Sequence, residues 1–387
     1  MDVREFDFDL PSELIAQEPP TARTGARLLC LGRASGALTH THVTALPDLL
    51  LTGDLVVVNN TRVFPARLIG RRAPTGGAVE CLLIRPVPDT GAGPPGPTPV
   101  SGTGVRHWGP IPVSGSGVGS PGQTPGSDPV LWEALVHPGQ KLKPGARVIF
   151  DGAHTLHGEI LERRFFGRRL VRLWTEDATA VDAAVDAIGH VPLPPYIKRV
   201  DRVDDRDRYQ TVFARARGSI AAPTAGLHFD PSLVTALEDR GVEMTEITLH
   251  VGYGTFQPVR VEQVEDHRLE EERYEINAAA ATAIARARCE GRRIIAVGTT
   301  TTRTLEAVAR VHGGHVVAGH GATDLFIYPG FDFRVVGGLL TNFHLPRSSL
   351  LMLVAAFAGR ARIRNAYEAA IAERYRFYSY GDAMLIL

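Results

Sequence analysis

The sequence lacks the features that would place the chain in a membrane or in an oxidising compartment. No run of 18 apolar residues occurs in its 387 residues, so neither a transmembrane helix nor a membrane partner is expected. The N-terminus is acidic and has no apolar signal-peptide core, which predicts a cytoplasmic protein. Cys30, Cys81 and Cys289 lie far apart and form no CxxC pair, which argues against a disulfide framework or a metal site.

The motifs of the best-known enzyme classes are also missing. There is no GxxxxGK[ST], HExxH or GxSxG, and no glycine-rich turn closes a strand as a dinucleotide-binding or common methyltransferase fold requires. The formal net charge is zero, so any basic surface for a nucleic acid must be local. Lysine is scarce, so nearly all basic residues are arginine, whose fork suits phosphate. Genomic base-composition bias is the simpler explanation of that preference.

The organisation of the chain indicates two kinds of structure. Residues 62–180 contain short strand-like runs separated by turns, which predict a small β-barrel or sandwich. Elsewhere strand and helix patterns alternate, as in α/β proteins. We therefore predict a large mixed, barrel-like α/β domain made of residues 1–61 and 181–387, with a β-barrel domain inserted at 62–180. Half of residues 88–129 are Gly or Pro, so this segment is expected to be a flexible insertion between two strands.

Polar side chains gather where apolar strand-like runs end. Ligands of α/β folds collect outside the carboxyl ends of the strands, so these clusters are candidates for one shared pocket. Each histidine, taken singly, fits a structural role equally well, and the hypothesis depends on the set. The clusters are at 59–62 (NNTR), 224–228 (TAGLH), 250–254 (HVGYG), 298–306 (GTTTTRTLE), 324–328 (DLFIY) and 342–347 (NFHLPR).

The cluster "GTTTTRTLE" has a structural interpretation and a functional one. One threonine is expected to cap the following helix, with Glu306 at a spacing like that of a capping box. That role leaves the other hydroxyls and Arg303 unexplained. Because helix N-termini also bind anions through free N–H groups, the sequence predicts a ligand site here.

A second feature is the segment 196–218, which has seven Lys or Arg residues against four Asp residues. A solvated loop with internal ion pairs explains this composition. Contact with a nucleic-acid backbone is the alternative.

Long stretches of the chain resemble one family, the S-adenosylmethionine:tRNA ribosyltransferase-isomerases of queuosine biosynthesis. They include "GDLVVVNNTRVFPARLIG", "RYQTVFARARGSIAAPTAGLHF", "RRIIAVGTTTTRTLEA", "TDLFIYPGFDFRVVGGLLTNFHLPRSS" and "YRFYSYGDAMLIL", and they extend from end to end. Only the Gly/Pro-rich insertion has no counterpart in the usual pattern.

The resemblance implies an unusual reaction. S-adenosylmethionine is the co-substrate, and no tightly bound cofactor or metal is expected. Its ribose moiety passes to 7-aminomethyl-7-deazaguanine (preQ1) at the wobble position of tRNAs for asparagine, aspartate, histidine and tyrosine. The product is epoxyqueuosine, with adenine and methionine released, and the enzyme is expected to be a monomer.

The resemblance also suggests roles for the clustered residues. The candidates for removing the proton beside the sulfonium are His228, His250 and His344, with Asp324 and Glu306 as carboxylate alternatives. The candidates for binding S-adenosylmethionine are Thr224, Thr299, Thr300, Arg303 and Asn342. The candidates for contacting tRNA are Arg62, Arg199, Arg202, Arg215 and Arg217, with Arg360 and Arg364 as further backbone contacts.

The sequence departs from the family pattern at two places. The usual R-D-x-S-R becomes R-T-G-A-R at 23–27, which keeps both arginines but loses an acid and a hydroxyl. Glu270 stands where the family commonly has a second histidine, three residues after His267. The competing hypotheses are an RNA methyltransferase, a non-catalytic tRNA-binding protein, and a family member with a different acceptor.

Overall fold

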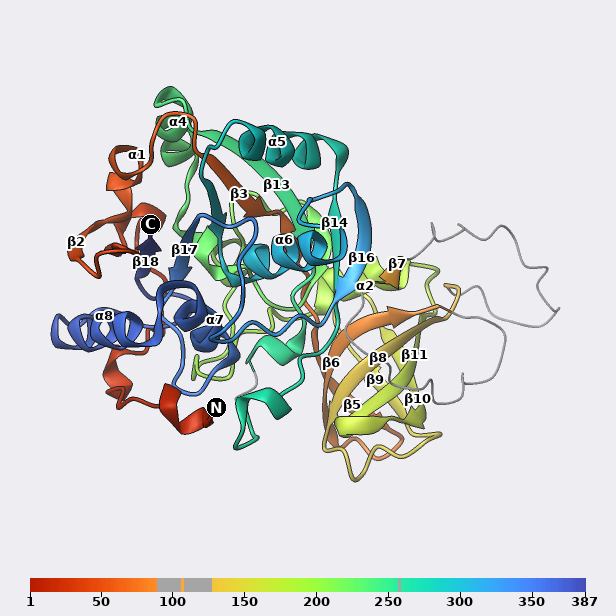
Figure 1. Cartoon of the computed structure of the whole chain (residues 1–387). Helices are drawn as coiled ribbons and strands as arrows, with labels where there is room; N and C mark the ends of the chain where they lie inside the picture. The colour runs from red at the N-terminus through yellow and green to blue at the C-terminus, as the bar shows by residue number, and fades with distance from the viewer. Residues whose placement is uncertain (89–105, 108–126, 257–258) are drawn as a thin grey trace.

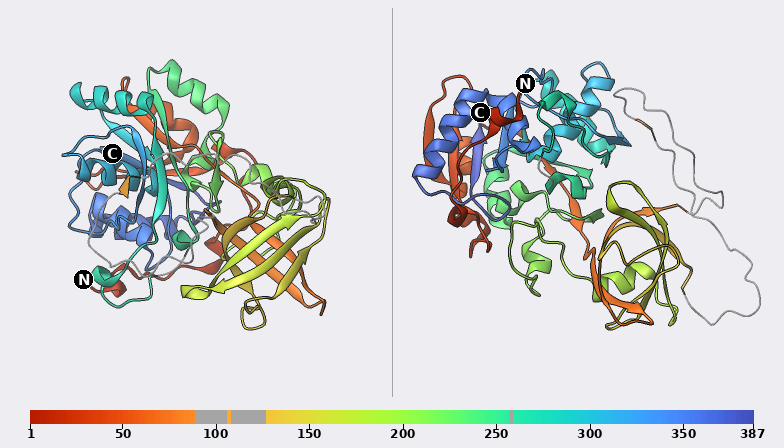
Figure 2. Two further views of the ribbon diagram at one scale, coloured as in Figure 1. Left: turned by 90° about the vertical axis from the view of Figure 1, so that its right-hand side faces the viewer. Right: turned by 90° about the horizontal axis from the view of Figure 1, so that it is seen from below.

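The computed structural model describes residues 1–88, 106–107, 127–256 and 259–387. A large sheet with helices on both faces forms one part, and a closed β-barrel lies beside it (Figure 1). Both further views in Figure 2 show the barrel to one side of the sheet. None of the helices in these ranges is long and apolar enough to cross a membrane.

The large sheet is mixed, with parallel pairs at its centre. β17, β15, β3 and β13 are parallel neighbours, so their carboxyl ends meet at the same edge of the sheet. In sheet order the ten strands are β2 (Leu38–His42), β1 (Arg27–Leu31), β18 (Ala383–Ile386), β17 (Gly338–Asn342), β15 (Ile294–Val297), β3 (Leu55–Asn59), β13 (Glu243–Leu249), β14 (Glu272–Ile276), β16 (Gly319–Thr323) and β7 (Arg106–His107).

Helices bury both faces of this sheet, and β3 shows why. Every residue of its sequence LVVVN is buried, as expected of a strand covered on both sides. Leu55 and Val57 join the core that holds α5–α8, whereas Val56 and Val58 join the core that holds α1 and α4, because successive side chains point to opposite faces. These helices are α1 (Leu46–Leu49), α4 (Pro231–Asp239), α5 (Ala278–Cys289), α6 (Thr299–Val311), α7 (Ser349–Ala358) and α8 (Arg360–Ala372).

The barrel has a core of its own. Val79, Cys81 and Leu83 of β6 alternate inward, and α2 (Val181–Ile188) adds Val181 and Val185 to the same core. In barrel order the strands are β10 (Leu156–Arg163), β11 (Arg168–Thr175), β8 (Val130–His137), β6 (Ala78–Val87), β5 (Arg67–Ala73) and β9 (Arg147–Phe150). The structure also contains a two-stranded parallel sheet of β4 (Thr61–Val63) and β12 (Ala216–Ser219), the short helix α3 (Asp205–Arg208) and the 3-10 helix η6 (Thr224–His228).

The predicted class, a large mixed α/β domain with an inserted small β-barrel, is confirmed. The large sheet has two edge strands, β2 and β7, and is therefore open where the sequence suggested a barrel-like form. The predicted domain limits, 1–61 with 181–387 and 62–180, stay a prediction. Most of the predicted flexible insertion at 88–129 lies outside the described residues.

Candidate functional site

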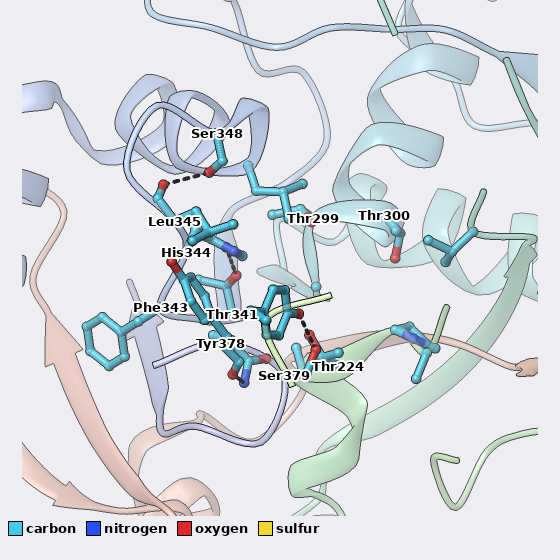
Figure 3. A pocket seen from close by; sticks show the side chains of 18 residues that line it. Thr224, Thr299, Thr300, Thr341, Phe343, His344, Leu345, Ser348, Tyr378 and Ser379 are labelled. Carbon is cyan, nitrogen blue, oxygen red and sulfur yellow. Dashed lines mark hydrogen bonds between the residues drawn. The ribbon is translucent and has the colours of Figure 1, made fainter. Parts of the chain in front are cut away.

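A cavity opens at the carboxyl ends of β15 and β17 (Figure 3). Four segments far apart in the sequence form its walls: 222–225, 298–300, 341–345 and 378–379. The space measures about 710 Å³ when its solvent-filled mouth is included. The cavity therefore lies where the sequence predicted a shared pocket.

The N-terminus of α6 forms one wall. Its N-cap is Gly298, whose φ of 89° favours glycine, and not a threonine as predicted. No described side chain caps the helix, so its first backbone N–H groups stay open to an anion. Thr301 and Thr302 donate their hydroxyls back to the carbonyls of Val297 (2.8 Å) and Gly298 (3.1 Å).

Thr299 and Thr300, the other two threonines of the run, line the cavity, and so does Thr224 of η6 (Figure 3). All three are among the binding residues that the sequence predicted. The Oγ1 atom of Thr300 is buried and has no hydrogen-bond partner in the described part of the chain. Because buried polar atoms are nearly always paired, this hydroxyl indicates a ligand contact.

Asn342, at the end of β17, lines the cavity and also has a buried polar atom without a described partner. Its Nδ2 atom donates to the carbonyl of Tyr378 and to Nε2 of His228, both at 3.1 Å. A carbonyl can only accept, so the amide orientation is fixed and Oδ1 is the atom left buried without a described partner. The sequence predicted Asn342 as a binding residue, and the structure makes the atom without a partner an acceptor.

His228 lies behind Asn342 and does not line the cavity. Its Nε2 accepts from Asn342, so its proton sits on Nδ1. Burial lowers the pKa of His228 to about 4, so the ring is neutral and holds Asn342 in place.

His344 is the predicted histidine that does line the cavity. Its Nε2 lies 2.8 Å from Oγ1 of Thr341 (Figure 3). Its backbone N–H donates to the hydroxyl of Tyr367 at 2.9 Å. Burial lowers the pKa of His344 to about 3, so the imidazole is neutral at physiological pH.

Sequence reasoning did not single out the aromatic side of the cavity. The rings of Tyr196 and Tyr378 lie 4.6 Å apart, and the Tyr196 hydroxyl bonds Ser379 at 2.6 Å. The hydroxyl of Tyr378 is buried without a described partner, and burial raises the pKa of this phenol. The sequence signal for Tyr378 and Ser379 was the matched string "YRFYSYGDAMLIL", which contains both.

Three predicted residues lie elsewhere. Arg303 points away from the cavity and forms a buried ion pair with Glu272 (2.5 Å) and a bond to the Leu325 carbonyl (2.9 Å). Asp324 is exposed just after β16 and does not line the cavity. His250 lines a second cavity and lies 2.8 Å from the hydroxyl of Thr61.

Glu306, the alternative carboxylate, is fully buried in the core. It accepts three backbone N–H groups, those of Arg334, Val335 and Val336 at 2.8–3.0 Å. This arrangement is structural and does not face the cavity.

Most of the arginines proposed for tRNA already have carboxylate partners. Arg199 forms two bonds to Asp205 at 2.6 and 2.8 Å and is largely buried. The other pairs are Arg202 with Glu18, Arg215 with Glu246, Arg217 with Asp186, Arg360 with Glu5 and Arg364 with Glu368, while Arg62 is exposed. Only Arg199–Asp205 is internal to the segment 196–218, whose other arginines in this set pair with carboxylates outside it, and the tRNA contacts stay a prediction.

The two departures from the family pattern lie outside the cavity. Arg23 donates to the carbonyls of Gln210 and Asp207, and Arg27 donates to that of Glu373, so both arginines bond the backbone. Glu270 pairs with Arg168 of the barrel and therefore ties the two parts of the molecule together.

Comparisons with known proteins decide the family. A model described as "Queuosine biosynthesis protein" matches residues 3–386. The chain belongs to this queuosine biosynthesis family. The S-adenosylmethionine:tRNA ribosyltransferase-isomerases of Desulfitobacterium hafniense and Anaeromyxobacter sp. are 45% and 47% identical to it, over 100% of this chain and 100% and 99% of theirs.

A solved structure of the queuosine biosynthesis family agrees. The crystal structure of S-adenosylmethionine tRNA ribosyltransferase from Thermotoga maritima is 34% identical, with a TM-score of 0.51, and covers 99% of this chain and 100% of that one. The resemblance seen in the sequence is therefore confirmed.

Proposed function

We propose that this chain is an S-adenosylmethionine:tRNA ribosyltransferase-isomerase. It transfers and isomerises the ribose moiety of S-adenosylmethionine onto preQ1 at the tRNA wobble position, giving epoxyqueuosine and releasing adenine and methionine. It acts as a cytoplasmic monomer on asparagine, aspartate, histidine and tyrosine tRNAs. One observation carries the assignment of the site: Thr300 Oγ1, Asn342 Oδ1 and Tyr378 Oη, three buried atoms without described partners, belong to residues lining one cavity.

The chemical groups that line the site match the parts of S-adenosylmethionine. Its carboxylate takes the open N–H groups at the start of α6, beside Thr299 and Thr300. Its adenine 6-amino group donates to Oδ1 of Asn342, the acceptor that has no described partner. No Asp, Glu, Lys or Arg is among the described lining residues, so the sulfonium cation meets the aromatic faces of Tyr196 and Tyr378.

His344 is the base of this proposal. Of the titratable residues that line the cavity, Tyr196 and Tyr378 stay protonated because burial raises their pKa values, and only His344 is in its proton-accepting form. It takes the proton from the ribose 5′ carbon, which the adjacent sulfonium acidifies. Its low pKa makes the resulting imidazolium a strong acid, suited to passing that proton to a ring nitrogen of departing adenine.

A product assay tests the reaction. The protein is incubated with S-adenosylmethionine and a tRNA carrying preQ1, and small molecules and digested nucleosides are analysed by mass spectrometry. Adenine and methionine together with epoxyqueuosine are expected. S-adenosylhomocysteine with a methylated nucleoside would instead identify a methyltransferase, and tRNA binding without turnover would identify a non-catalytic binder.

Loss of the 5′ hydrogen tests the role of His344. S-adenosylmethionine labelled with deuterium at the 5′ carbon should lose label during turnover by the wild type. His344→Gln should slow this loss by about 10²–10⁴-fold, the usual contribution of a general base. His228→Gln is the matched comparison, because it should mainly raise the KM for S-adenosylmethionine through Asn342. Unchanged label loss in His344→Gln would exclude this base.

A further inference from the structure

A second cavity lies between the barrel and the edge of the large sheet. It encloses about 1,170 Å³ with its open mouth, and its walls come from both parts of the molecule, including Trp132 of β8 and Arg273 of β14. His250, the predicted catalytic histidine that does not reach the first cavity, lines this one.

One thin wall separates the two cavities. Val251 lines the first cavity, whereas its neighbour His250 lines the second. Two hydrogen bonds join this segment to β12 and the residue after it: Val251 N–H donates to Ser219 Oγ (2.6 Å) and Ile220 N–H donates to the Val251 carbonyl (3.1 Å).

The second cavity contains a flat, fixed cationic surface. The guanidinium of Arg217 lies 4.7 Å from the centre of the Phe64 ring and donates to Asp186 at 3.0 Å. Phe64 is in turn buried against Trp132, with ring centres 5.6 Å apart. Arginine planes and aromatic rings are the surfaces on which RNA-binding proteins stack unpaired bases.

Two further groups in the cavity call for polar partners. Trp132 is 3% exposed, and its Nε1, which can only donate, has no hydrogen-bond partner in the described part of the chain. Arg273 forms no ion pair with any described carboxylate, unlike Arg217. A flat ring that carries a hydrogen-bond acceptor would pair with Trp132, and an anion attached to that ring would pair with Arg273.

We propose that the second cavity binds an unpaired nucleobase of the substrate RNA, next to the nucleotide that reacts. The base stacks on the face of the Arg217 guanidinium that is turned away from Phe64, its carbonyl or ring nitrogen accepts from Trp132, and its phosphate lies near Arg273. The wall excludes this base from the first cavity, so it is a neighbour of the target and not the target itself. This inference rests on the proposed function, because it assumes that RNA is the substrate.

Three variants and a control test the stacking role through the affinity for an anticodon stem-loop. Arg217→Lys and Arg217→Ala should weaken binding about equally, by about tenfold, because a lysine keeps the charge but not the plane. Trp132→Phe keeps a ring but lacks the N–H and should weaken binding about fivefold. Arg172→Gln, an exposed arginine on the same barrel outside the cavity, should have no effect. Full rescue by Arg217→Lys would show a phosphate contact instead and overturn the stacking role.

A double-mutant cycle locates the base. Stem-loops with an abasic site on the 5′ or the 3′ side of the target are measured against the wild type and Arg217→Lys. At one of the two positions the abasic site should weaken binding by the wild type about tenfold. At the same position it should weaken binding by Arg217→Lys only slightly further. Additive losses at both positions, while the wild type still converts the intact stem-loop, would refute the inference and leave the proposed function standing. Failure of the wild type to bind or convert any stem-loop would overturn both.

Discussion

Thr300→Val should make the ligand-free protein more stable and its binding of S-adenosylmethionine weaker. The Oγ1 atom of Thr300 is buried without a described partner, so the folded protein bears the cost of dehydrating it. Valine has nearly the same shape, and the two residues have similar helix propensities. Removing the hydroxyl should therefore add about 1–2 kcal/mol to the free energy of unfolding. In calorimetry this corresponds to a rise in Tm of about 1–4 °C.

Binding of S-adenosylmethionine should reduce or reverse the stability advantage of Thr300→Val over the wild type. Loss of one hydrogen bond of about 0.5–1.5 kcal/mol raises the Kd for S-adenosylmethionine by about 2- to 13-fold, measurable by titration calorimetry. At a concentration of 100 times its Kd, the ligand stabilises the wild type by about 2.7 kcal/mol, and the variant by less. The difference in Tm between the two proteins should therefore shrink or change sign as the ligand is added.

Thr301→Val is the matched control. Its hydroxyl donates to the Val297 carbonyl at 2.8 Å and does not line the cavity. This variant should lose about 1 kcal/mol of stability and keep its affinity for S-adenosylmethionine. The reasoning fails if Thr300→Val is less stable than the wild type without ligand, or if it binds S-adenosylmethionine as tightly.

Other regions give further expectations. Arg303→Met should cost about 3–5 kcal/mol in thermal unfolding, because it removes the guanidinium that neutralises the buried Glu272 carboxylate, and the double variant with Glu272→Gln should recover much of it; a normal Tm with lost S-adenosylmethionine affinity would instead support an anion site. Asp324→Asn should leave kcat/KM unchanged in the product assay, and a loss above tenfold would contradict its placement away from the cavity. The folded-state pKa of His228, about 4, lies below the 6.5 of an ordinary histidine, so the unfolded chain binds more protons between these values. The free energy of unfolding should thus fall by about 3 kcal/mol for this residue as the pH falls from 6.5 to 4, and His228→Gln should flatten that slope in denaturant titrations.

The fold and the place of the site could be predicted from patterns that local physics dictates. The continuous apolar run of β3 indicates a strand buried on both faces, and "DPSLVTALEDRG" carries both helix signals that α4 uses, with Asp230 as its N-cap. Polar residues after β15 and β17 meet in one cavity because those strands are parallel. Their convergence followed from topology, which the alternation of strands and helices already indicated.

The direction of individual side chains could not be predicted in this way. Arg303 and Thr300 are three residues apart on α6, yet one pairs with Glu272 in the core and the other lines the cavity. Tyr378 was missed because its contribution depends on a backbone with φ of 73° and on a ring from residue 196, neither of which its local sequence reveals. Long-range partners of this kind decide which polar residue is free to bind and which one is structural.

In the proposed reaction, a lining without Asp, Glu, Lys or Arg among the described residues of the first cavity would favour catalysis. Loss of the 5′ proton turns the cationic sulfonium centre into a neutral ylide, so a carboxylate beside it would favour the ground state over the transition state. At 4 Å and an effective dielectric constant of about 20, that preference is worth up to about 4 kcal/mol, or about 10³-fold in rate. Aromatic faces attract the cation far less, at about 0.5–2 kcal/mol, and so sacrifice less of the rate. Tyr196, Tyr378 and the neutral ring of His344 give a site that binds the donor without opposing its deprotonation.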